Sequence, residues 1–197
     1  MTLCVQSVKL TGQRSACPVG RPSPQSIDVA APRDRPQRGH PVGIVTTSSE
    51  TAFTQSAETV YDFVTNPANW TKTYPGSDHV GEVPTNLPLK IGDVWTEAGP
   101  DGNRVYTWHL AIAMRPKMWV FNSVGRLGHD REGNGGMEGR ITVQYHFTRP
   151  GADITLFTRT MTIEAYKDAP LPDKLFGIVN PANIDKYHAA IARELAT

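Results

Sequence analysis

The feature that most constrains the fold is a long stretch of alternating apolar and polar residues. Strand-like segments lie near 78–83, 92–99, 103–114, 118–127, 137–148 and 153–165, and 43–55 is rich in Thr, Ser and Val, which suits a further strand. The dipeptides Asp101-Gly102, Pro116-Lys117 and Pro150-Gly151 are turn signals between these segments. The sequence therefore predicts seven antiparallel strands joined mostly by short turns.

Helical patterns occur in two places: directly after the first predicted strand and at the end of the sequence. Ser56 can cap a short helix over 57–65, which ends before Asn66-Pro67, and a second short helix can follow over 67–74. The closing segment 171–196 is expected to be an amphipathic helix, broken or kinked near its start by Asn180-Pro181. Its apolar stripe recurs at three-to-four spacing: Ile184, Tyr187 or His188, Ile191 and Leu195.

Alternation gives the predicted sheet one apolar, aromatic face. A hairpin turn at Pro116-Lys117 places one set of side chains on that face: Trp108, Leu110, Ile112, Met114, Trp119, Phe121, Ser123 and Gly125. Only the terminal helix and the short helix pair can cover it. We therefore expect an α+β fold, in which a curved seven-stranded antiparallel sheet wraps around the long C-terminal helix.

One helix is too narrow to fill the concavity of such a sheet, so an apolar cavity is expected between them. A ring-bearing or lipid-like ligand would need a cavity of roughly 300–600 Å³. A cavity under about 100 Å³ would count against ligand binding and against catalysis on a small molecule.

Residues 1–42 differ in composition from the rest, with six prolines and no aromatic residue. We interpret them as a disordered tail or an over-long start, and 43–197 as the folded, ligand-binding domain. Six basic and two acidic residues give the tail a charge of +4, which leaves 14 basic and 17 acidic residues, or −3, on the domain. Both cysteines, Cys4 and Cys17, lie in the tail, so no disulfide or thiolate site is expected in the domain.

Several classes of function are disfavoured by these patterns. No run of 18 apolar residues and no secretory signal is present, so we expect a cytoplasmic protein without a membrane span. A net charge of +1 does not favour nucleic acid as a partner. The histidines are scattered singly, so no metal and no other cofactor is expected, and we expect a monomer or a homodimer.

The Gly-rich segment 125–136 lacks the strand, the Gly-Lys-Ser/Thr ending and the helix of a phosphate-binding loop. We expect it to form a hairpin loop with an exposed tip. The alternative is a gating loop over the mouth of the cavity.

The predicted order of one strand, two short helices, six strands and a long terminal helix resembles the START-like (SRPBCC) superfamily with its helix-grip fold. Segment 53–67 is similar to that family's first strand, small-residue cap and first helix, Trp70 to an aromatic of its second short helix, and 90–93 to the turn before its third strand. The resemblance spans about 43–197. The superfamily contains polyketide cyclase/dehydrases, coenzyme-Q-binding proteins, plant hormone receptors and pollen allergens, so the resemblance implies a cavity but no single activity.

Three functions follow as hypotheses. The first is binding of an apolar or ring-bearing small molecule in the cavity, the second is polyketide cyclase/dehydrase-type catalysis (aldol cyclisation or dehydration) there, and the third is a protein-interaction module without small-molecule chemistry. The candidate ligand-binding residues are aromatic, apolar or hydroxyl-bearing positions of the sheet and helices: Trp70, Trp95, Trp108, Phe121, Ser123, Val143, Thr158, Thr160 and Tyr187.

The candidate catalytic residues are groups able to move protons, namely Tyr106, Tyr145, Glu97 and His188. Glu97 faces the cavity if the Asp101-Gly102 hairpin has a four-residue loop and faces solvent if it has three. His188 is an acid or base in the cavity, or a histidine at the edge of the core with a backbone partner. For 153–165, alternation leaves open which set of side chains faces inward.

Overall fold

The computed structural model describes residues 43–74, 76–99, 104–127, 129–130, 132–151, 154–166 and 179–196. All of these belong to the predicted folded domain. The predicted tail over 1–42, the Asp101-Gly102 turn and residues 171–178 of the predicted terminal helix lie outside the described residues.

The described residues form one antiparallel sheet of seven strands in the order β1-β7-β6-β5-β4-β3-β2. Each neighbouring pair in this order is hydrogen-bonded. The strands are β1 (Ile44–Phe53), β2 (His79–Gly81), β3 (Val94–Ala98), β4 (Val105–Met114), β5 (Met118–Leu127), β6 (Met137–Gly151) and β7 (Ile154–Ala165). The predicted strand count is confirmed. The first strand, β1, lies at one edge of the sheet beside the last strand, β7, and β2 lies at the opposite edge.

The helices begin where capping side chains are available. Ser56 Oγ accepts a hydrogen bond of 3.1 Å from the Thr59 backbone N–H at the start of α1 (Ala57–Val64). The predicted second short helix is a 3₁₀ turn, η1 (Pro67–Asn69), followed by α2 (Trp70–Thr73). At the start of α4 (Pro181–Glu194), Asn180 Oδ1 accepts from the Ala182 N–H at 3.0 Å and Pro181 occupies the first turn. Asn180-Pro181 therefore marks where this helix begins.

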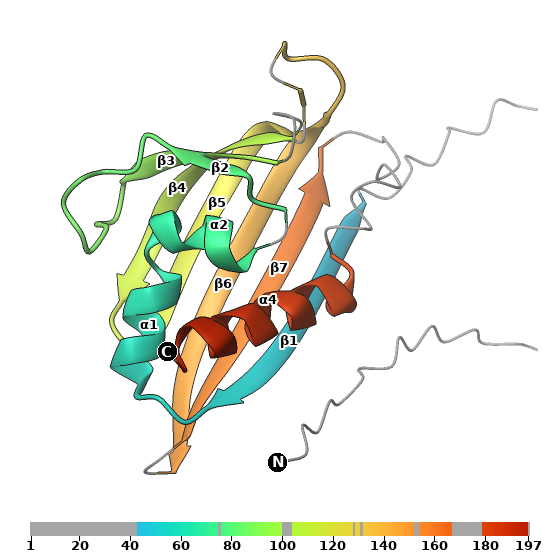
Figure 1. Ribbon diagram of the computed structural model, residues 1–197. Coiled ribbons are helices and arrows are strands. Elements are labelled where there is room, and N and C mark those ends of the chain that lie inside the picture. The colour runs from blue at the N-terminus through green and yellow to red at the C-terminus, as the bar shows by residue number, and fades with distance from the viewer. Residues whose placement is uncertain are drawn as a thin grey trace, which may run out of the picture. The chain divides into compact units, whose positions relative to one another are not determined.

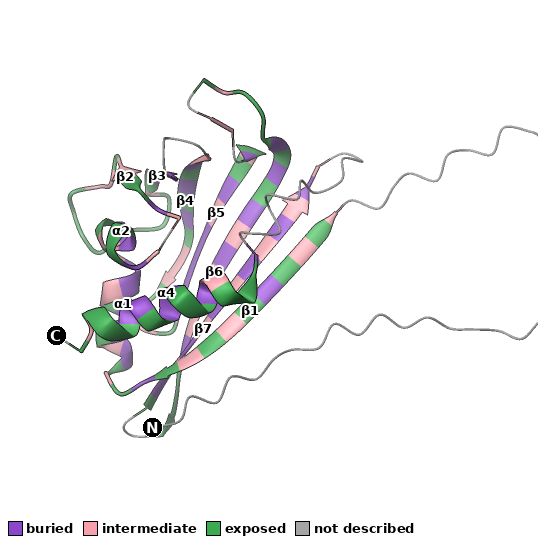
Figure 2. Ribbon diagram, turned by 45° about the vertical axis from the view of Figure 1, so that its right-hand side comes forward, coloured by how far each residue is buried: buried purple, intermediate pink, exposed green. Residues whose placement is uncertain are grey.

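The helices lie on one face of the curved sheet, with α4 running across the part that contains β6, β7 and β1 (Figure 1). Buried and less buried positions alternate along β7 and most of β6 (Figure 2), as expected for a sheet that has one face covered by helices. This is the sheet-around-helix arrangement predicted from the sequence, and its core lies between the two layers.

An irregularity in β4 changes which side chains of this strand face the helices. The register shifts between Leu110 and Ile112, so Ile112 lies opposite Val120 instead of Trp119. Trp108 and Leu110 stay buried on the inner face, but Met114 is 51% exposed. The expected inward placement of Ile112 and Met114 was wrong because an extra residue in one strand reverses the phase of the side chains beyond it.

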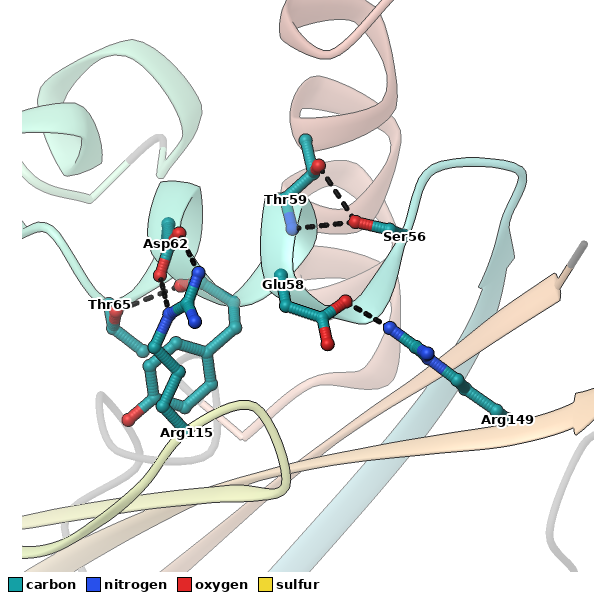
Figure 3. Close-up of polar contacts among 8 residues, drawn as sticks. Ser56, Glu58, Thr59, Asp62, Thr65, Arg115 and Arg149 are labelled. Atoms are coloured by element: carbon teal, nitrogen blue, oxygen red, sulfur yellow. Dashed lines mark hydrogen bonds and ion pairs between the residues drawn. The ribbon is translucent and has the colours of Figure 1, made fainter.

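Two ion pairs hold α1 against the ends of the sheet hairpins (Figure 3). Arg115, beside the β4–β5 turn, donates two hydrogen bonds of 2.6 Å to the Asp62 carboxylate, and Arg149 of β6 pairs with Glu58. These side chains are roughly half exposed, so solvent screens both pairs and they contribute little to stability.

Candidate functional site

A small cavity lies between the inner face of the sheet and the helices α2 and α4. Its volume is about 50 Å³. Residues of seven elements or their adjoining loops line it: Trp70, Tyr74, Gly76, Glu97, Arg104, Tyr106, Trp108, Phe121, Ile141, Val143, Tyr145, Arg159, Met161 and Tyr187. Tyr74, Gly76 and Arg104 are only partly buried, so they form its mouth.

The β3–β4 pair supplies a buried carboxyl group. Glu97 lies opposite Tyr106, and Trp95 opposite Trp108, which is the register that a four-residue loop predicts. Trp108 Nε1–H donates to Glu97 Oε2 at 2.7 Å. Burial raises the pKa of Glu97 above its usual value, and the Trp108 hydrogen bond offsets part of this rise. Glu97 is therefore more readily protonated than an exposed glutamate.

Strands β6 and β7 and helix α4 supply a second polar group of side chains. The hydroxyl groups of Tyr145 and Tyr187 lie 3.2 Å apart, and burial raises the pKa of both phenols. Arg159 lies opposite Tyr145 in the sheet and is 5% exposed. Its guanidinium carbon is 5.7 Å from the ring centre of Tyr74 and 5.4 Å from that of Tyr187. These distances place the cation against two aromatic faces.

Sequence reasoning missed Arg159. The alternation of β7 contained the signal, because the apolar residues Phe157, Met161 and Ile163 are in phase with Arg159. A strand that turns its apolar set toward the core also turns this arginine inward. All four side chains are buried in the structure.

Eight of the residues predicted for the site line the cavity together: Trp70, Glu97, Tyr106, Trp108, Phe121, Val143, Tyr145 and Tyr187. Trp95 and Ser123 are buried on the same side of the sheet but do not line it. Trp95 packs on Trp119 with ring centres 5.6 Å apart, so it supports the wall of the cavity from behind.

Thr158 and Thr160 are corrections to the predicted site. Both lie on the outer face of the sheet, because the apolar set of β7 occupies the inner face. Thr158 Oγ1 donates to Glu50 Oε2 at 3.0 Å, and the hydroxyls of Thr160 and Ser48 lie 2.9 Å apart. Their hydroxyl groups cannot reach a ligand in the cavity.

His188 is buried beside the cavity without lining it. It is 1% exposed, and its Nδ1 lies 2.8 Å from Thr51 Oγ1. Burial lowers the pKa of His188 to about 3, with a further contribution from the positive charge of Arg159. The geometry favours the core-histidine alternative, with a threonine hydroxyl as the partner instead of a backbone group.

At about 50 Å³, the cavity is much smaller than the expected roughly 300–600 Å³. It also lies below the limit of about 100 Å³ given above, so in its present shape it counts against ligand binding and against catalysis on a small molecule. The aromatic side chains account for the difference. Trp70 packs against Trp95, Trp119 and Phe121 with ring centres 5.3 to 6.3 Å apart, and Tyr74 packs edge-on against Tyr187. As it stands, the cavity holds about one or two water molecules or one small polar group.

The remaining expectations concern metals, membranes and the glycine-rich loop. Within the described ranges, no group of three or more His, Cys, Asp or Glu side chains is placed to hold a metal ion. No helix among the described residues is long and apolar enough to cross a membrane. The described part of 125–136 contributes no cavity-lining residue, and the His129 carbonyl accepts a 3.0 Å hydrogen bond from the Val105 N–H instead.

No protein-family model and no curated protein sequence matches the chain. Solved structures do match its fold. The protein Mll3558 from Rhizobium loti matches with a TM-score of 0.57 and 18% identity over 79% of this chain and 99% of its own. Norcoclaurine synthase from Thalictrum flavum, solved in complex with dopamine and hydroxybenzaldehyde, matches with a TM-score of 0.57 and 10% identity. The match covers 79% of this chain and 88% of the synthase. The Zhui aromatase/cyclase from Streptomyces sp. R1128 matches with a TM-score of 0.57 and 12% identity, over 77% of this chain and 93% of its own.

Proposed function

From the helix-grip fold of the START-like superfamily, which this chain has, we propose that it binds a ring-bearing small molecule in the cavity between the sheet and α4. One observation carries the proposal. Buried polar groups from β3, β4, β6, β7 and α4 converge on a single aromatic-walled cavity, where a purely structural core would hold apolar side chains. Structural relatives that hold small organic molecules or carry a cyclase name support it.

The cavity must widen to accept such a ligand, because about 50 Å³ is smaller than a benzene ring requires. Tyr74 is the side chain best placed to move. It follows the four-residue helix α2, is only half-buried, and lies between the mouth and the Tyr187 ring. Side-chain rotations of this kind commonly accompany binding.

Native mass spectrometry of freshly purified protein tests the proposal. We expect a mass above that of the polypeptide, which disappears on denaturation. The Val143→Phe variant should lose the added mass because the larger side chain fills the cavity, whereas Thr142→Phe, on the outer face of the same strand, should keep it. Bare polypeptide in every preparation, together with no binding of added aromatic probes, would contradict the proposal.

A cyclase/dehydrase-type enzyme is the second candidate, and the Glu97–Tyr106 pair favours it. Glu97 has a raised pKa, lies opposite Tyr106 and shares the cavity with it, and the Tyr106 hydroxyl has no hydrogen-bond partner among the described residues. Such a pair can move protons in aldol closure or loss of water. Wild-type protein should then convert a linear poly-β-ketone into a cyclised product, followed by ultraviolet absorbance, and Glu97→Gln should bind the same compound without converting it.

A further inference from the structure

Arg159 is a buried cation without an ionic partner among the residues that the structure describes. Its guanidinium group interacts with the Tyr145 hydroxyl, but its Nε and Nη1 atoms have no hydrogen-bond partner among these residues. An unpaired buried charge destabilises a folded protein, so its presence in a core requires a reason. The side chain lines the cavity, which gives its free N–H groups access to whatever the cavity holds.

The carboxyl group of Glu97 forms no ion pair with this guanidinium group, although the positive charge of Arg159 offsets part of the rise that burial causes in the pKa of Glu97. It shares the cavity with Arg159, but it accepts the Trp108 N–H. Burial also raises the pKa of Glu97, which favours its uncharged form. Arg104 lies at the mouth of the cavity. The described lining therefore contains two guanidinium groups, those of Arg104 and Arg159, and one carboxyl group, that of Glu97. The cavity therefore has an excess of positive charge.

Two aromatic rings lie against the guanidinium group. The rings of Tyr74 and Tyr187 lie 5.7 and 5.4 Å from its carbon atom, and their faces attract a cation without satisfying its N–H groups. A guanidinium group placed in this way is well suited to bind a carboxylate, which accepts hydrogen bonds and supplies the missing negative charge.

We infer that the ligand is a ring-bearing organic anion whose carboxylate accepts hydrogen bonds from Arg159 and whose ring lies among Trp70, Trp108 and Phe121. This inference rests on the proposed function and adds the chemical class of the ligand to it. A carboxylate group fits the present cavity of about 50 Å³, whereas the ring requires the displacement of Tyr74.

Matched acids and amides test the inference, because each pair has the same shape and differs in charge. The probes are benzoate and benzamide, 3-phenylpropanoate and 3-phenylpropanamide, and 1-naphthoate and 1-naphthamide, titrated into the full chain by calorimetry at pH 8. We expect the wild-type protein to bind at least one acid about tenfold or more tightly than its amide. Arg159→Met should abolish that preference, and Arg140→Met, on the exposed outer face of β6, should leave it unchanged.

Thermal unfolding without ligand gives a second readout that a merely structural arginine would not produce. Replacing an unpaired buried cation with an apolar side chain of similar length should raise the melting temperature of Arg159→Met by about 2 °C or more. A lower melting temperature, or failure of the variant to fold, would contradict the view that the charge is unpaired.

The outcomes separate this inference from the proposed function. Equal binding of acids and amides by the wild-type protein overturns the inference and leaves small-molecule binding intact. Binding of amides alone does the same. If neither series binds and no molecule is retained on purification, both proposals are wrong.

Discussion

At the scale of single residues, Glu97 connects the chemistry of the site with the stability of the fold. Its folded-state pKa is raised by burial, so above the ordinary value of 4.5 the unfolded chain gives up this proton more readily than the folded chain. Glu97 therefore stabilises the fold fully below about pH 4.5, and this contribution is lost as the pH rises through its folded-state pKa.

Glu97→Gln should remove this pH dependence and keep an oxygen acceptor for Trp108 Nε1. We expect the variant to be more stable than wild type at pH 8 by on the order of 1 kcal/mol, with a smaller difference at pH 4. Urea unfolding at both pH values measures this. A difference that does not grow with pH would show that Glu97 ionises as freely in the folded as in the unfolded chain.

His188 predicts the opposite pH dependence. Its pKa falls from 6.5 to about 3 on folding, so between these values the unfolded chain binds a proton that the folded chain does not. Stability attributable to His188 is complete above pH 6.5 and is lost as the pH falls toward 3, by up to about 1.4 kcal/mol per pH unit.

Comparison of His188→Gln with wild type between pH 4 and 7 tests this. The stability advantage of the wild type should shrink as the pH falls. His109→Gln, which changes an exposed histidine of β4, is the matched control. Parallel curves for wild type and His188→Gln would mean that the buried imidazole titrates normally.

At the scale of elements, the alternation of apolar and polar residues predicted the strands better than it predicted which face of the sheet each side chain occupies. The strands and their antiparallel arrangement followed from period-two patterns and turn signals. The Glu97–Tyr106 register was one of two that the sequence left open, and the structure has the one expected for a four-residue loop. The faces of β7 did not follow from these patterns, because the outward threonines resemble ligand-binding hydroxyls and the inward set contains an arginine. The phase change in β4 was also missed, because no local residue signals the extra position after Leu110.

Strand β6 offers a matched pair of glycines that tests the sheet packing. A Cβ atom at Gly139 would meet the Glu164 carbonyl oxygen and the side chains of Met137 and Leu127, whereas at Gly151 it would meet nothing within 4 Å. Gly139→Ala should therefore lower the free energy of unfolding by about 1–3 kcal/mol, and Gly151→Ala should change it by less than about 0.5 kcal/mol. Equal effects in chemical denaturation would contradict the close approach of β6 and β7 at Gly139.

At the scale of the whole domain, the sheet and the helices enclose less space than the sequence suggested. Period-two patterns show which side chains face the helices but not how completely those side chains fill the concavity. Here Trp70, from the short helix α2, occupies much of the centre, anchored by the 3.1 Å hydrogen bond from its Nε1–H to the Val64 carbonyl. The described domain thus holds charged and polar groups around a small cavity, and binding is expected to widen it at Tyr74.

The central claim is that a small molecule occupies this cavity, and the indole signals of the four tryptophans test it most directly in ¹⁵N-labelled protein. Titration with the tightest-binding acid of the probe series should shift the indole N–H resonances of Trp108 and Trp70, which line the cavity. The backbone amide of Thr142, on the outer face, should stay in place. Saturation with no movement of either indole signal, or shifts confined to residues outside the lining, would contradict the account.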